Sequence, residues 1–327
     1  GMVHMGNRMD IGIEIFQPDR GFTWDGNPGF FYDGNNPKRF YVPEFGYNRM
    51  LNDRLSFGVA VFGAGGQNAT YQQHPFIGPL RTKTDLSQLF IVPTWSYKID
   101  DRNSFGVAPI LAVQSFELIN AAFGSFPSPG HETSFGVGMR IGWMGQVTDR
   151  ITLGAAVQST INMSNMDKYP QIRSLDVPAN VTFGVAFKAS DRLDILADLY
   201  WIDYAGVSPI GTPSSLGGFG WSDIWVAKLG AVYKWSDTLT LRVGANLGES
   251  PLPSGAPNDG FVSSLVPATT KNHATLGFTK DFNDSFSLTG SFIYTFSEDF
   301  TPAAPPGFRL TSTMDQFAIG VSGNWKF

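Results

Sequence analysis

The sequence predicts an all-β fold: a 14-stranded antiparallel transmembrane β-barrel with short turns at one end and long loops at the other. Three observations predict it. Short polar turns recur along the whole chain, the residues beside them alternate between apolar and polar, and only 16% of the 327 residues are charged. Because the repeat runs from end to end, we expect a single barrel domain over residues 1–327.

Composition excludes several other classes of protein. A membrane-spanning helix needs about 18 consecutive apolar residues, and the chain has no such run. The net charge of −5 argues against nucleic acid as a partner, because nucleic-acid binding needs a basic surface. With 0 cysteines, neither a disulfide bond nor a thiolate metal site can form. We therefore expect no cofactor and no metal ion.

Six short turns mark one end of the expected barrel. Each holds Asp beside other small polar residues, which close tight turns by bonding their own backbone. These turns contain Asp53, Asp101, Asp149, Asp191, Asp237 and Asp284, spaced 42 to 48 residues apart. The other connections are long and rich in Pro, Gly, Ser and Asn, and they cover about 18–38, 64–87, 118–131, 160–175, 205–221, 249–268 and 298–313. This asymmetry is typical of barrels of the Gram-negative outer membrane.

The segments beside the turns show the alternation of half-buried strands. In residues 193–201, 239–247 and 317–327 one face is apolar, and the other is mostly polar or small. About ten such residues cross a bilayer at a tilt. Six turns join twelve strands, and segments near 9–17 and 314–327 add the first and the last. A β-propeller also has a repeat of about 45 residues. A propeller blade holds four short strands, however, whereas each repeat here holds two long ones.

A row of glycines occupies the face that we expect to line the lumen. Seven residues before the marker Asp stand Gly46, Gly142, Gly184, Gly230 and Gly277. Arg140 and Arg242 share this lumen face, whereas aromatic residues such as Trp143 and Phe278 follow on the outward face as an interfacial girdle. The inward glycines either leave room for a plug or a ligand, or ease the curvature of the strands.

Apolar residues in the third and fourth long loops are the candidates for ligand binding. Apolar loop residues beyond a membrane call for a partner, and flexible Met suits varied apolar ligands. The candidates are Phe116, Leu118, Ile119, Phe123, Phe126, Ile161, Met163 and Met166. The alternative is that they pack against one another and steady the loops. Lys168 or Arg173 is a candidate contact for a ligand carboxylate.

Catalytic chemistry finds little support in the sequence. The four histidines lie far apart, and no GxSxG, HExxH or P-loop motif occurs. His273 beside Asn272 is the one position at which a lipid-modifying hydrolase can be imagined. We therefore expect no catalytic residue.

Several motifs, taken in order, resemble the FadL-type family of outer-membrane transporters for long-chain fatty acids and aromatic hydrocarbons. They are Tyr47–Gly58, Asp176-Val177-Pro178, and Leu241–Gly244 followed by Glu249–Pro253. The resemblance implies a monomeric barrel plugged by an N-terminal hatch. It also implies that ligand is caught among the outer loops and leaves sideways at a kinked third strand. Gly63, Gly65 and Gly66 would form that kink, or they are an ordinary glycine-rich approach to a loop.

The family's hatch motif before the first strand has no counterpart here, so we expect a signal peptide and a hatch to be missing from the chain. The resemblance implies passive uptake of fatty acids or aromatic hydrocarbons, with a general porin for polar solutes or, less favoured, a lipid-modifying enzyme as alternatives. The implied partners are a hydrophobic small-molecule ligand and the lipids and lipopolysaccharide of the outer membrane.

Overall fold

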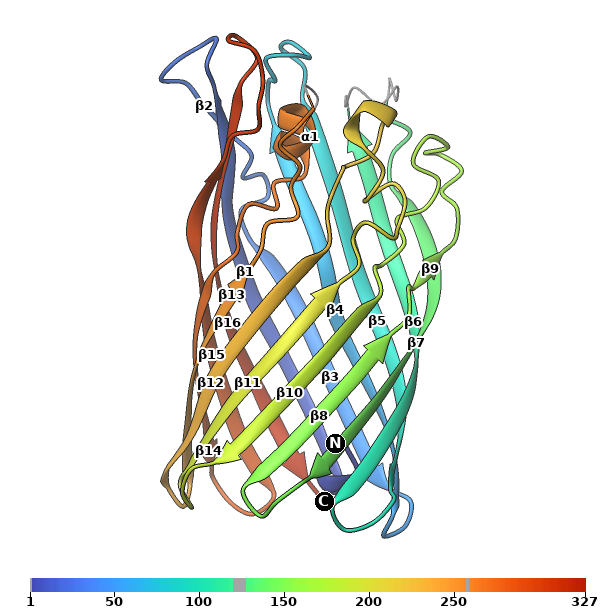
Figure 1. Ribbon diagram of the computed structural model, residues 1–327, viewed down its shortest axis with the longest axis vertical. Helices are drawn as coiled ribbons and strands as arrows, with labels where there is room; N and C mark the ends of the chain where they lie inside the picture. Colours follow the sequence, from blue (N-terminus) through green and yellow to red (C-terminus); the bar gives the residue numbers. More distant parts are fainter. Residues whose placement is uncertain (1, 120–127, 257–258) are drawn as a thin grey trace.

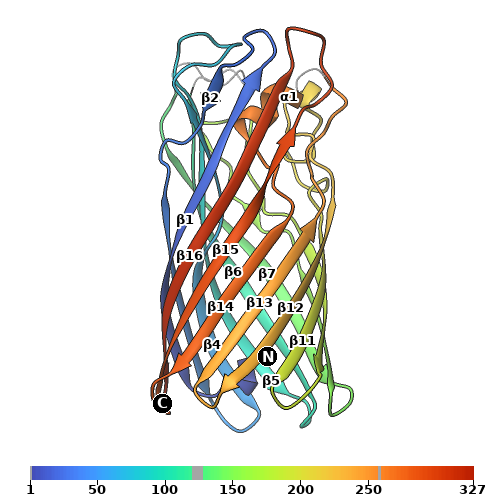
Figure 2. The ribbon, with the colours of Figure 1, turned by 90° about the vertical axis from the view of Figure 1, so that its left-hand side faces the viewer.

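A closed barrel forms the whole molecule (Figures 1 and 2). The structure is a computed structural model that describes residues 2–119, 128–256 and 259–327. In this part of the chain one antiparallel sheet closes where β1 pairs with β16, from Arg8↔Lys326 to Trp24↔Leu310. Two of its 16 strands, β2 (Phe31–Asp33) and β9 (Asn162–Met163), are short, so fourteen form the wall. The predicted fold is confirmed.

The wall strands are β1 (Arg8–Trp24), β3 (Phe40–Met50), β4 (Leu55–Tyr71), β5 (Thr82–Lys98), β6 (Asn103–Ile119), β7 (Glu132–Gln146), β8 (Ile151–Gln158), β10 (Asn180–Lys188), β11 (Leu193–Ile202), β12 (Ile224–Ser236), β13 (Leu239–Gly248), β14 (His273–Asp281), β15 (Phe286–Phe300) and β16 (Leu310–Lys326). Three short helical pieces accompany them: η1 (Met2–His4), η2 (Ser214–Leu216) and α1 (Asp259–Leu265). No helix of the described residues is long and apolar enough to cross a bilayer.

The short turns are closed by the residue before the marker Asp rather than by the Asp itself. Asn52 Oδ1 accepts the backbone N–H groups of Arg54 and Leu55, both at 2.9 Å. Asp100, Thr148, Ser190 and Asn283 accept the equivalent pairs in their own turns. The turn chemistry is as expected, but the capping side chain stands one residue earlier.

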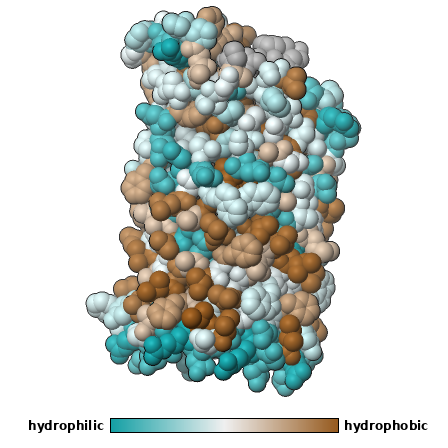
Figure 3. All heavy atoms as spheres, in the orientation of Figure 1, coloured by the Kyte–Doolittle hydropathy of each residue, from teal (hydrophilic) through white to brown (hydrophobic). Residues whose placement is uncertain are grey.

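The two faces of the wall differ in polarity. Figure 3 shows apolar side chains gathered in a band around the lower half, between a hydrophilic base and a more polar upper part. On β7 the outward Phe135, Val137 and Ile141 are exposed, and they alternate with the inward Gly136 and Gly138. An outward apolar band is the surface that a barrel presents to lipid.

Several strands extend further toward the outer end than the alternation pattern predicted. β6 reaches Ile119 and stays paired with β5 up to Lys83↔Ile119. Phe116, Leu118 and Ile119 are therefore strand residues, and their prediction as loop residues was wrong. The reason is that alternation continues beyond the apolar band, with buried Phe116 and Leu118 separated by the outward carboxylate of Glu117.

Candidate functional site

A loop between β8 and β10 folds into the barrel over two glycines of β7. A Cβ atom added at Gly136 would lie 2.2 Å from Met163 Sδ, and one at Gly138 would lie 2.8 Å from Ile161 Cγ1. The loop can approach this closely only because both positions lack a side chain. Its backbone is tied down by Ser164 N–H donating to Phe135 O at 2.7 Å.

The inward loop completes a buried apolar cluster, here called the mouth cluster. Its buried members are Phe116, Leu118, Met166, Tyr169, Ile172, Leu175, Leu265 and Val266, with Leu86, Phe219, Trp221 and Phe261 packed against them. Tyr169 is held from both sides: its hydroxyl accepts Leu118 N–H at 3.1 Å and donates to Gly130 O at 2.8 Å. Its ring meets Phe116 edge-on at 5.0 Å. The cluster is therefore built on a fixed aromatic side chain.

Polar side chains at its edges hold α1 over the mouth cluster. Asp259 at the start of α1 accepts Ser214 Oγ–H at 2.6 Å and Ala256 N–H at 2.7 Å. At its other end, Tyr71 donates its hydroxyl to Ser264 O at 2.7 Å. α1 lies within the outer rim of the barrel in both ribbon views (Figures 1 and 2). It covers the cluster from the outside.

A second apolar cluster, the inner cluster, lies further along β6 toward the short turns. Its buried members are Phe90, Ile110, Ala112, Ile161 and Met163, with Ala64, Val92 and Val177 against them. Ala64 is the extra residue of a β-bulge, because the pairing of β4 with β5 shifts between Gly63 and Gly65. The inner cluster thus reaches the wall at the irregular stretch of β4.

The wall between β3 and β4 has an incomplete hydrogen-bond ladder at this height. In the described residues the pairing of these strands begins at Glu44↔Phe62, whereas β3 already pairs with β1 from Phe40. Gly63 and the residues after it in β4 therefore have no partner in β3. The position of Gly63, Gly65 and Gly66 at this gap is an observation, and their role in ligand exit stays a prediction.

Arg20 lies in the wall beside the gap between β3 and β4, toward the outer end of the barrel. Its side chain is 2% exposed, and its guanidinium donates to Pro18 O at 3.1 Å and to Pro37 O at 3.2 Å. It also donates to the backbone and the side-chain oxygens of Asn68 in β4. This one side chain therefore connects β1 to β4 where the strand ladder is missing.

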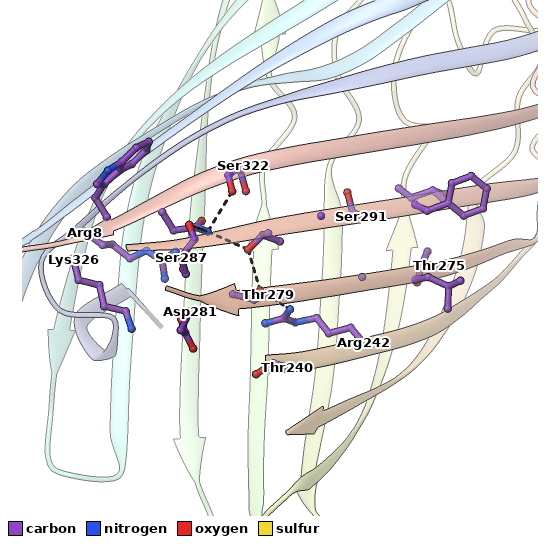
Figure 4. A pocket seen from close by; sticks show the side chains of 18 residues that line it. Arg8, Thr240, Arg242, Thr275, Thr279, Asp281, Ser287, Ser291, Ser322 and Lys326 are labelled. Carbon is purple, nitrogen blue, oxygen red and sulfur yellow. Dashed lines mark hydrogen bonds between the residues drawn. The ribbon is translucent and has the colours of Figure 1, made fainter. Parts of the chain in front are cut away.

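The expected lumen residues lie in a polar cavity and on the walls around it, toward the short turns. The cavity has a volume of about 640 Å³, and Arg242 and Gly277 are among its lining residues (Figure 4). Arg242 donates to Thr279 Oγ1 at 2.8 Å, and Thr279 and Asn324 each bond to Thr289 at 2.9 and 3.0 Å. This end of the lumen is polar, unlike the two apolar clusters.

The remaining lumen candidates stand on neighbouring strands. Gly142 faces Ala156 of β8, and Arg140 follows the same alternation along β7. Gly184 pairs with Asp198, and Gly230 pairs with Gly244. A Cβ at Gly184 would lie 2.4 Å from Asp198 Oδ1, so this glycine makes room for the carboxylate.

An acidic group on the outer face, which the sequence did not single out, brings Asp85, Glu117 and His131 together. Lys83 Nζ lies 2.7 Å from Asp85 and 2.8 Å from Glu117. Because the one ammonium bridges both carboxylates, the group is explained as a salt-bridge network at the rim.

The structure divides the predicted ligand-binding residues among three places. Phe116, Leu118 and Met166 meet in the mouth cluster, and Ile161 and Met163 in the inner cluster. Ile119 ends β6 outside both clusters, whereas Phe123 and Phe126 lie outside the described residues.

Sequence reasoning missed the contribution of α1. The short apolar stretch at Phe261, Val262, Leu265 and Val266 was the available signal, but it stands within a long polar connection. Of the two proposed contacts for a carboxylate, Lys168 donates to His131 O at 2.6 Å and Arg173 is exposed with a φ of 64°. Neither is a member of a cluster. His273 bonds Thr295 Oγ1 at 3.0 Å.

Comparison with known proteins gives a family. Residues 32–326 match the family model described as outer membrane protein transport protein (OMPP1/FadL/TodX). No match was found among the curated proteins.

The fold resembles solved structures of low sequence identity. The P. putida toluene transporter TodX has a TM-score of 0.80 at 18% identity, covering 98% of this chain and 90% of that one. A Pseudomonas aeruginosa FadL homologue has a TM-score of 0.73 at 17% identity, with coverage of 100% and 92%. The Ralstonia pickettii toluene transporter TbuX has a TM-score of 0.72 at 15% identity, with coverage of 98% and 90%. The chain belongs to the OMPP1/FadL/TodX family of transport proteins, and it is a β-barrel of the Gram-negative outer membrane.

Proposed function

We propose that this protein lets small, neutral, hydrophobic molecules, above all aromatic hydrocarbons, diffuse inward across the outer membrane. The observation that carries the proposal is the mouth cluster, in which eight apolar side chains are buried together at the outer end of the barrel. Burial of apolar surface in this cluster would supply the binding free energy. Two structural neighbours, TodX and TbuX, are toluene transporters, which agrees with the proposal.

The composition of the clusters favours a neutral ligand over a fatty acid. A carboxylate buried without a counter-charge costs several kcal/mol, roughly, because it loses its hydration. On the outer face Lys83 pairs with the carboxylates of Asp85 and Glu117, and Lys168 donates to the backbone oxygen of His131. Aromatic and Met side chains make up half of the mouth cluster, and these suit flat apolar molecules.

The proposed route runs from the mouth cluster through the inner cluster to the gap between β3 and β4. Ala64, in the bulge of β4, packs against the inner cluster, so the apolar lining is continuous up to the wall. An apolar molecule that reached this point would leave sideways and avoid the polar cavity toward the short turns. No cofactor is needed, and the concentration gradient drives the flow.

Uptake by whole cells tests this function. A Gram-negative strain without a channel of this kind is supplied with a cytoplasmic enzyme that consumes toluene, so consumption reports passage across the outer membrane. We expect saturable toluene uptake with this protein, reduced roughly tenfold in Phe116→Ala, since the substitution removes an aromatic ring that the ligand would contact in the mouth cluster. Uptake of labelled oleate is expected to stay at the level of the empty strain.

Two other outcomes would overturn the proposal. Swelling of proteoliposomes in sugar solutions, without saturable toluene uptake, would show a general porin. Hydrolysis of lipid that disappears in His273→Ala would show an enzyme.

A further inference from the structure

Three aromatic rings, two exposed and one half-buried, stand together at the outer tips of the barrel. Phe308 is 60% exposed and Phe76 is 39% exposed, and their ring centroids are 6.0 Å apart. The Trp24 ring meets Phe76 edge-on at 6.1 Å. Exposed aromatic side chains beyond the lipid band call for a partner. We call Trp24, Phe76 and Phe308 the outer aromatic patch.

The loop that carries Phe308 is held by polar bonds. Asp25 accepts Gly307 N–H at 2.9 Å and Arg309 N–H at 3.1 Å, so both neighbours of Phe308 are fixed. The indole ring of Trp24 adds a bond of its own, because Trp24 Nε1–H donates to Gly307 O at 2.9 Å. The Phe308 ring is therefore presented in a fixed arrangement that does not depend on its own contacts.

His74 fixes Phe76 in the same way. Its Nδ1 accepts Phe76 N–H at 3.3 Å, which leaves the proton on Nε2 to donate to Ser264 Oγ at 3.1 Å. Ser264 Oγ–H in turn donates to Phe261 O at 2.7 Å. Burial lowers the pKa of His74 to about 4, so the imidazole is uncharged at neutral pH. The loop of Phe76 is thus bonded to α1 through neutral groups.

Phe261 connects the outer aromatic patch to the interior. Its ring lies 6.5 Å from Phe76 and 5.0 Å from His74, and it also packs against the mouth cluster. Exposure falls along this path, from Phe308 at the surface to Leu265, the last residue of α1, at 1%. α1 itself packs against β16, where a Cβ at Gly260 would be 3.6 Å from Leu310 Cβ. The path is apolar and graded from solvent to core.

We propose that the outer aromatic patch captures a neutral aromatic hydrocarbon and passes it along Phe261 into the mouth cluster. This inference rests on the proposed function, and it places capture beside α1 and β16, away from the loops in which the sequence predicted it. Ring-on-ring contacts select flat aromatic molecules here. The continuity of the patch with the mouth cluster assigns its occupant as the transported molecule.

Transport kinetics provide one test. We expect Phe76→Ala/Phe308→Ala to raise the half-saturating toluene concentration roughly five- to tenfold with an unchanged maximal rate, because two ring contacts to the ligand are lost. Leu80→Ala, which truncates an exposed apolar residue of the same loop as Phe76, is the matched control and should behave as the unsubstituted protein. Equal half-saturation in all three proteins would overturn the inference.

A binding measurement separates this inference from the proposed function. p-Bromotoluene quenches tryptophan fluorescence on contact, and the part of the quenching that Trp24→Phe removes reports occupancy of the patch. We expect that part to be present in the purified protein and absent in Phe76→Ala/Phe308→Ala. If it is present while cells take up no toluene, capture stands and the transport proposal fails. If uptake is saturable but Trp24 is never quenched, capture at this patch is refuted.

Discussion

Beside the mouth cluster, the hydroxyl of Thr84 is buried and has no hydrogen-bond partner among the described residues. It is 4% exposed and pairs across the sheet with Leu118, a member of the cluster. Leaving a buried polar group unpaired costs free energy that an apolar group of the same shape avoids. At the scale of single residues, the site therefore contains a destabilising unpaired hydroxyl that a substitution can remove.

Thr84→Val should stabilise the protein by about 1 kcal/mol, because it keeps the side-chain shape and removes the unpaired hydroxyl. Urea unfolding of the detergent-solubilised barrel measures the change. Thr82→Val, two residues earlier on the same strand, removes a hydroxyl that donates to Leu80 O and should not stabilise. A loss of stability in Thr84→Val would mean that the hydroxyl has a partner.

Arg20 differs from Thr84, because its buried polar side chain has hydrogen-bond partners that connect β1 to β4. Arg20→Met should destabilise the barrel by roughly 3 kcal/mol, since the buried carbonyls of Pro18 and Asn68 lose their donor. The temperature at which heating changes the mobility of the protein in SDS gels is a simple readout. Arg49→Met, on an exposed arginine near a short turn, is the control and should leave that temperature unchanged.

At the scale of elements, the site depends on loops that fold inward. The segment after β8 can lie against β7 only because Gly136 and Gly138 carry no side chain. α1 covers the result and is fastened at Asp259 and Ser264. Each contact has its own prediction.

Gly138→Ala should weaken the inward loop by about 1–2 kcal/mol, because the new Cβ would be 2.8 Å from Ile161 Cγ1 and 3.3 Å from Ile161 Cα, and backbone cannot move aside cheaply. Hydrogen exchange of residues 161–177 would report the loosening. Gly142→Ala on the same strand is the control, since its nearest neighbours would be at 3.5 and 3.6 Å. Equal exchange in the two variants would contradict this account of the loop.

Acid should loosen α1 through His74. The folded pKa of about 4 lies below the ordinary value of 6.5, so the unfolded state binds the proton more readily. Stability is full above about pH 6.5 and falls as the pH drops toward 4, by up to about 3 kcal/mol. Hydrogen exchange of residues 261–265 should speed up across this window, and the increase should be absent in His74→Gln. An increase that persists in His74→Gln would assign the effect to another group.

At the scale of the whole molecule, the alternation of residues such as those in 239–247 was enough to predict the strands, because lipid and lumen impose opposite chemistry on the two faces of the wall. The places of Ile161 and Met163 could not be predicted in this way. Their position depends on Gly136 and Gly138 of β7. The sequence of an apolar loop does not show whether the loop faces water or the lumen. Leu265 and Phe261 were missed because seven residues of helix leave little periodic signal.

The gap in the wall is likewise invisible in the sequence. Gly63, Gly65 and Gly66 predicted an irregular strand, but only the pairing pattern shows that β3 and β4 separate above Glu44↔Phe62. Arg20 gave no signal, since it falls in the connection predicted at about 18–38, whereas β1 extends to Trp24. Polar bonds between distant segments decide such details.

We propose that ligand leaves the barrel sideways between β3 and β4. A Cβ added at Gly63 would lie 3.8 Å from Val42 Cβ, which is close to the mean separation in a disulfide of about 3.8 Å. Because the chain has 0 cysteines, Val42→Cys/Gly63→Cys can form only this bond within one molecule. The control, Gly142→Cys/Ala156→Cys, places its Cβ atoms 3.6 Å apart between strands already paired.

The decisive measurement is toluene uptake by cells carrying each pair, before and after oxidation and again after reduction. We expect oxidation to stop toluene uptake by the Val42→Cys/Gly63→Cys variant and reduction to restore it. The Gly142→Cys/Ala156→Cys variant should take up toluene under all three conditions. Undiminished uptake through the oxidised β3–β4 pair would contradict the sideways route.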